Sequence, residues 1–260
     1  MSKLFLFVCI GVVFLIVVND VDCQKGPKPK PPPKPPKPTK KPKKTKTPPT
    51  TTQPTTTTTA VPPCGNNGMN PSTRKAFLFT HNRLRSRLAR GEAMNGDIGM
   101  APRAANMLKM KYDCDAEASA MAAANTCSGK LSPPETRPGY KENFIKIYKT
   151  YLNLPQTARH ASERWWEQLS RYGANRQMLF TYDMRIEKTR IIRNWGKMAW
   201  HDNEIFGCAI ARCSGFNFVV CHYAPGGNYI GENFYTIGAP CSMCPQGSKC
   251  DNTTMLCESP

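Results

Sequence analysis

An α+β fold is the class that this 260-residue sequence predicts. Three segments between residues 71 and 173 place apolar residues at helical spacing, whereas residues 205–225 contain two short runs of β-branched and aromatic residues that are typical of strands. Helices followed by strands, without a regular alternation of the two, favour α+β over a doubly wound sheet. An even number of cysteines beyond the N-terminal region predicts that disulfides hold this fold together.

The first 23 residues have the pattern of a signal peptide. Residues 4–18 are an unbroken apolar run that follows Lys3 and precedes a polar segment, and we expect cleavage near Cys23. This run is shorter than the roughly 20 residues that a membrane-spanning helix needs, and no later segment approaches about 18 apolar residues. We therefore predict a secreted, extracellular protein that does not span a membrane, which disfavours a transmembrane receptor or a cytosolic enzyme.

Residues 24–63 predict a disordered stalk. They contain 14 Pro, 11 Thr and 10 Lys and no acidic residue, so they cannot bury enough apolar surface to offset the entropy of folding. The basic first half is expected to be extended polyproline II, and the threonine-rich second half invites O-glycosylation. Its ten lysines make an extracellular polyanion an expected contact, with a plain soluble spacer as the alternative, and the lack of aromatic residues for base stacking argues against nucleic acid.

Residues 64–260 have the length of one domain and carry the helix and strand patterns. The first helix is expected to have Ser72 as its N-cap, to bury Phe77, Leu84 and Leu88, and to expose an arginine-rich side.

Two further helices and a hairpin follow along the chain. Asp115 precedes an alanine-rich second helix, and the third helix repeats Ala161, Trp165 and Leu169 every four positions. The two strand-like runs are separated at Gly215, which predicts an antiparallel hairpin.

Ten cysteines remain once the signal peptide is removed, and in an oxidising compartment they predict five disulfides whose pairing the sequence leaves open. They are Cys64, Cys114, Cys127, Cys208, Cys213, Cys221, Cys241, Cys244, Cys250 and Cys257. A zinc site built on the last four is the alternative, which secretion disfavours because exposed thiols oxidise outside the cell. Asn252, followed by Thr253 and Thr254, is an N-glycosylation acceptor in this cysteine-rich tail.

The segment FVVCHYAPGGNY at residues 218–229 matches the second signature of the CAP superfamily, which contains cysteine-rich secretory proteins, antigen-five allergens and plant pathogenesis-related proteins. Residues 80–91, 110–120 and 164–173 resemble the first three helices of that family, and the tail resembles the hinge of nematode activation-associated secreted proteins. The resemblance implies a three-layer α-β-α sandwich at residues 64–240, followed by a hinge-like tail at 241–260.

Many CAP proteins hold two histidines and two glutamates in a cleft that can bind a divalent metal. The resemblance places these four positions at Leu131, Glu142, Gln168 and Asn194, so that only Glu142 keeps a family residue type. A transition metal prefers imidazole or thiolate ligands, and amides cannot exchange protons near neutral pH. We therefore predict no metal, no cofactor and no catalytic residue, and interpret His81 and His222 as structural.

These observations favour a secreted, non-enzymatic interaction protein that acts on a host or cell-surface protein partner. A lipid or sterol carrier that uses a groove of the sandwich is the alternative, because some members of the family bind such ligands. A metal-dependent hydrolase is the third hypothesis, against which the missing histidines and glutamate argue.

Overall fold

The computed structural model describes residues 61–65 and 68–260, so the predicted signal peptide and residues 24–60 of the predicted stalk lie outside the described residues. The helices are α1 (Pro71–Ala89), α2 (Cys114–Asn125), α3 (Leu154–Tyr172), α4 (Tyr182–Ile186) and α5 (Arg193–Ala199), with the short 3-10 helices η1 (Gly96–Ile98) and η2 (Pro134–Thr136). The strands are β1 (Lys111–Tyr112), β2 (Lys141–Ile147), β3 (Ile205–Cys213), β4 (Phe216–Ala224), β5 (Lys249–Asp251) and β6 (Leu256–Glu258).

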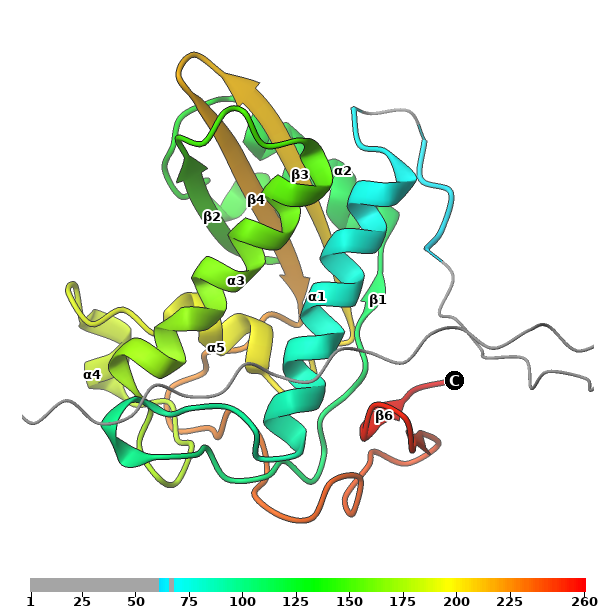
Figure 1. Ribbon diagram of the computed structural model, residues 1–260, viewed down its shortest axis with the longest axis vertical. Helices are drawn as coiled ribbons and strands as arrows, with labels where there is room; N and C mark the ends of the chain where they lie inside the picture. The colour runs from blue at the N-terminus through cyan, green and yellow to red at the C-terminus, as the bar shows by residue number, and fades with distance from the viewer. Residues whose placement is uncertain (1–60, 66–67) are drawn as a thin grey trace, which may run out of the picture. The chain divides into compact units, whose positions relative to one another are not determined.

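A four-stranded sheet in the order β1-β3-β4-β2 forms the middle layer (Figure 1). β1 runs parallel to β3, and the other neighbours are antiparallel. Helix α2 packs on β3 and β4 from one face, while α1, α3 and α5 cover the other face. This arrangement confirms the α+β class and the three-layer sandwich.

The predicted hairpin is β3 and β4, which are joined at Gly215. Gly207 of β3 permits the close approach of α2, because a Cβ there would lie 2.1 Å from the backbone nitrogen of Glu117. A larger residue at this position would force the helix away from the sheet.

The predicted starts of the first two helices are wrong by two residues each. Asn70, not Ser72, caps α1: its Oδ1 accepts a 2.8 Å hydrogen bond from the backbone nitrogen of Thr73, and Pro71 occupies the first helical position. Asp113, not Asp115, caps α2 through a 2.7 Å bond from the backbone nitrogen of Ala116. In each case an earlier polar residue takes the cap, and the predicted one lies in the first turn.

Helix α1 buries Phe77, Leu84 and Leu88 as predicted, but its arginines do not all face solvent. Arg85 is fully buried and donates to four carbonyl groups, at Leu108, Met198, Trp200 and His201. Burial lowers the pKa of this guanidinium to about 9. Arg74 is also buried, where it forms an ion pair with Glu117 at 2.7 Å. A guanidinium can lie in the interior when its fixed donors meet enough acceptors.

The core includes Trp165, Trp195 and Trp200, each at most 1% exposed. The first packs with the sheet and the other two form a second cluster around Phe234. These tryptophans stabilise the fold through buried area.

All ten cysteines form disulfides, which confirms the predicted number and supplies the pairing. The pairs are Cys64–Cys114, Cys127–Cys213, Cys208–Cys221, Cys241–Cys250 and Cys244–Cys257. The last two occupy the four sulfur atoms that a zinc site in the tail would need. No helix in the described part of the chain combines the length and apolar character that crossing a membrane requires.

Candidate functional site

Of the four positions taken from the family tetrad, three fall into two groups and Leu131 lies apart from both. Glu142 on β2 is 3% exposed and lies in a polar network. The Leu131 side chain, on the preceding loop, is 54% exposed and offers no ligand atom. Gln168 on α3 and Asn194 on α5 meet in the second group.

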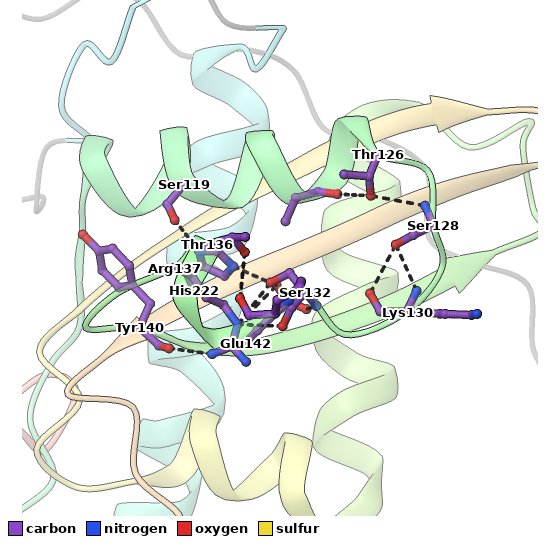
Figure 2. A network of polar contacts seen from close by, with 12 residues as sticks. Ser119, Thr126, Ser128, Lys130, Ser132, Thr136, Arg137, Tyr140, Glu142 and His222 are labelled. Atoms are coloured by element: carbon purple, nitrogen blue, oxygen red, sulfur yellow. Dashed lines mark hydrogen bonds and ion pairs between the residues drawn. The ribbon is translucent and has the colours of Figure 1, made fainter.

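Glu142 is the centre of a network that we call the Glu142 clamp, made of Ser119, Ser132, Arg137, Glu142 and His222 (Figure 2). His222 Nε2 lies 2.9 Å from Glu142 Oε2, and the backbone nitrogen of Ser132 donates to Glu142 Oε1 at 2.9 Å. The Ser132 hydroxyl donates to Glu142 Oε2, and Arg137 Nε lies 3.8 Å from the same oxygen. Both carboxylate oxygens are therefore occupied by the protein itself.

The clamp joins four parts of the fold. Glu142 and His222 are cross-strand partners in the β2–β4 pair, Ser119 belongs to α2, and Ser132 and Arg137 flank the η2 turn. Burial alone would raise the pKa of Glu142, but the hydrogen bonds from His222 and Ser132 outweigh it and lower the pKa below its usual value. The carboxylate is held in its charged form.

His222 also contacts Ser119, which produces the order serine, histidine, carboxylate. Its Nδ1 lies 3.0 Å from Ser119 Oγ. When Nε2–H donates to Glu142, Nδ1 can accept the serine proton, as in a hydrolase triad. However, the side chains of His222 and Glu142 are both 0% exposed, and the ring of Tyr140 stacks on the imidazole with 5.7 Å between ring centroids. The imidazole and the carboxylate therefore belong to the polar part of the core, while Ser119 is half-buried.

Sequence reasoning treated His222 as structural but missed its partners. The only signal available was the strand pairing, since Glu142 and His222 are opposite each other once the register of β2 and β4 is known.

His81 is structural in the same sense: Nδ1 lies 2.9 Å from the Phe77 carbonyl oxygen and Nε2 lies 3.0 Å from the Tyr223 hydroxyl. Burial lowers the pKa of His81 to about 3, so the ring is neutral at physiological pH.

Gln168 and Asn194 form the second group. Gln168 Oε1 accepts hydrogen bonds from the backbone nitrogens of Asn194 at 2.9 Å and Trp195 at 3.0 Å. The Asn194 carbonyl accepts from Asn143 Nδ2 at 2.9 Å. The amide at the glutamate position of the family thus holds the start of α5 and leaves its nitrogen as a donor.

A pocket of about 220 Å³ lies beside this amide pair, between α3, β2 and the segment that leads into α5. We call it the α3 pocket. Its walls are the aromatic residues Phe144, Trp165 and Tyr172 with two isoleucines, and its polar lining is Arg164, Arg171, Gln168, Asn194 and Thr189. No acidic residue lines it within the described part of the chain.

Lys197 is a cation that sequence reasoning did not identify. Its Nζ donates to the Arg193 carbonyl at 2.9 Å. Burial lowers the pKa of Lys197 to about 7, the cations of Arg193, Arg185 and Arg137 add to the shift, and Glu142 opposes it. The positive groups around this lysine outnumber the negative one, which is the reverse of a metal-binding cleft.

Comparison with known proteins places these features in context. The sequence model of the cysteine-rich secretory protein family (CAP) matches residues 78–223. The Ancylostoma secreted protein of Ancylostoma caninum is 41% identical over 195 residues, which are 75% of this chain and 46% of that protein. This chain therefore spans about half the length of that relative. Hookworm platelet inhibitor 1 of the same organism is 28% identical over 73% of this chain and 84% of its own length.

Solved structures show the same similarity to secreted proteins of this kind. Na-ASP-1 superposes with a TM-score of 0.71 at 42% identity, covering 75% of this chain and 49% of that one. NaASP2, in a structure described with Zn²⁺, superposes with a TM-score of 0.70 at 36% identity, covering 75% of this chain and 99% of its own.

Proposed function

Because this chain belongs to the cysteine-rich secretory protein (CAP) family, we propose that it is a secreted, non-enzymatic binding protein that acts outside the cell on a host or cell-surface protein. Its relatives include a protein named as secreted and one named as a platelet inhibitor, and both names fit an extracellular binding role. The five disulfides support the proposal, since a cross-linked domain offers a binding surface that loses little entropy on association.

The observation that carries this proposal is the state of the four tetrad positions. Zinc is bound by imidazole, thiolate or carboxylate, with carboxylate oxygens free to ligate. Here Glu142 is occupied by its own clamp, and Leu131 has no ligand atom in its side chain. The Gln168 oxygen is held by two backbone nitrogens, and the Asn194 side chain offers only an amide. The residues present do not fit the metal that NaASP2 was solved with, and no step of a metal-dependent hydrolysis is derived from them.

We extend the proposal to the organisation of the chain: a signal peptide at 1–23, a stalk at 24–63, a CAP domain at 64–240 and a hinge-like tail at 241–260. Asn252 is the proposed glycosylation site of the tail. It is exposed in the turn between β5 and β6, as a glycosylation acceptor must be.

A pull-down from serum and cell-surface extract tests the binding role. The full secreted chain and the variant that starts at residue 64 are compared at low and high salt. We expect a protein partner that both forms retain at high salt, since the domain surface makes the contact. Retention that needs the stalk and is lost at high salt would instead support contact with a polyanion, because exposed charges are screened.

The alternative function, a lipid or sterol carrier, predicts a different result. Organic extraction of the purified protein followed by mass spectrometry would recover a stoichiometric lipid if a groove of the sandwich carried one. A protein partner in the pull-down and no lipid in the extract is the combined result that the proposed function requires.

A further inference from the structure

The α3 pocket presents a row of hydrogen-bond donors on one helix face. Arg164, Gln168 and Arg171 are separated by four and three residues, and all three line the pocket. Residues at this spacing lie above one another on a helix. Because Gln168 Oε1 is held by the start of α5, its Nε2 group is the part left to donate.

The charge of the pocket is positive. Glu167 forms ion pairs with Arg164 at 2.6 Å and with Arg171 at 3.4 Å, but it does not line the pocket. One carboxylate thus neutralises one of two guanidiniums, and these half-exposed pairs are weak because water competes with them. An anion in the pocket can form charge-assisted hydrogen bonds with the remaining donors.

The rest of the pocket is apolar and aromatic. Trp165 is 1% exposed and forms the inner wall, and Phe144 and Tyr172 line the pocket with it. The side chains of Asn194 and Tyr172 also line the pocket, so they add two polar groups beside this wall. A ligand that satisfies both parts must carry an aromatic or apolar body next to its negative charge.

We propose that the α3 pocket binds an aromatic group that carries an anionic substituent, as the sulfated tyrosine side chain of an extracellular partner does. This inference rests on the proposed function, since the partner supplies the group. The volume of about 220 Å³ is below the roughly 300–1,000 Å³ of pockets for drug-sized ligands, so it suits one side chain. An aspartate or glutamate side chain would leave the aromatic wall uncovered.

The probe is N-acetyl-O-sulfotyrosine amide, titrated into the full secreted chain and followed by chemical shifts or calorimetry. We expect saturable binding, and binding at least about tenfold weaker for N-acetyltyrosine amide and for inorganic sulfate, since each lacks one half of the interaction. Phenylacetate tests whether the ligand is a free aromatic acid and not a sulfated tyrosine of a partner protein. If phenylacetate binds as tightly as the sulfated probe, the assignment to a partner's side chain is overturned.

Variants locate the site. Gln168→Glu keeps an acceptor for the start of α5 and adds a negative charge, so it should fold normally and abolish probe binding. Arg171→Gln should weaken binding about tenfold through the loss of a charge-assisted contact. Arg159→Gln is the matched control, since this arginine is exposed on the same helix and does not line the pocket.

Two results would overturn the inference. The first is no saturable binding of the sulfated probe by wild type, or binding equal to that of inorganic sulfate. The second is a partner from the pull-down that binds Gln168→Glu as well as it binds wild type. In the second case the proposed function stands and only the α3 pocket is excluded, whereas an empty pull-down removes the proposed function independently of the probe.

Discussion

The Glu142 clamp and the α3 pocket contain three of the four positions that the family resemblance predicts for a metal, yet their chemistry is opposite. In the clamp, a buried carboxylate meets a buried histidine, a serine and a buried arginine. In the pocket, the amides of Gln168 and Asn194 and two arginines line an open hollow. The difference teaches that neighbouring parts of one sandwich can bury a carboxylate in the core and leave amides and arginines on an open surface.

The largest expected loss of stability comes from breaking the Glu142 clamp. Glu142→Ala leaves His222 and the Ser132 backbone nitrogen without their acceptor in the interior, and removing one member of a buried pair costs about 3–5 kcal/mol. Denaturant unfolding of the disulfide-intact protein measures the loss. A change within experimental error would show that the clamp does not stabilise the domain.

The next effect tests the amide of Gln168 as a support for α5. Gln168→Ala removes the acceptor of two backbone nitrogens and should cost about 1–3 kcal/mol in unfolding free energy. Gln168→Glu supplies the acceptor again, so its stability should stay close to wild type. Equal stability of all three proteins would contradict the role assigned to this side chain.

A third prediction concerns pH and Lys197. The unfolded chain holds this proton up to about pH 10.5, while the folded chain releases it near pH 7, so the unfolded state binds more protons in between. The stability of wild type relative to Lys197→Met should therefore rise as pH increases from 7 towards 10. The lysine is half-buried, so solvent reduces the size of the effect. Unfolding curves at several pH values check the sign, and a relative stability that falls with pH would refute it.

The variant with the smallest expected effect on stability, Glu167→Gln, gives the sharpest test of the α3 pocket. Glu167→Gln removes two exposed ion pairs, each worth at most about 1 kcal/mol, so the unfolding free energy should hardly change. The same variant releases both arginines, and the pocket should bind the sulfated probe more tightly than wild type does. Unchanged or weaker binding would mean that the arginines do not face the ligand.

Much of the fold could be predicted because its signals are local. The apolar repeats of α1 and α3 and the hairpin at Gly215 follow from neighbouring residues. The number of disulfides follows from the cysteine count of the secreted chain. Helix starts were wrong where two polar residues compete for one cap, as Asn70 and Ser72 do. The burial of Arg85 was missed, because its acceptors are carbonyl groups that only the folded backbone brings together.

The site was predicted less completely than the fold. The assignment of Leu131, Gln168 and Asn194 to family positions stays a prediction. The partners of Glu142 could not be predicted, since His222 lies 80 residues away and Ser132 ten. The α3 pocket could not be predicted for the same reason. Its arginines come from one helix, but its aromatic wall includes Phe144 of β2, so the pocket exists only after the layers pack.

Zinc titration of the tag-free secreted chain by calorimetry tests the central claim most directly, since the claim is that the four family positions no longer form a metal site. We expect no stoichiometric binding, because the Glu142 oxygens are already occupied and amides are poor zinc ligands. One zinc ion per chain at micromolar affinity, lost in Glu142→Ala but kept in a folded control such as Arg159→Gln, would contradict the account.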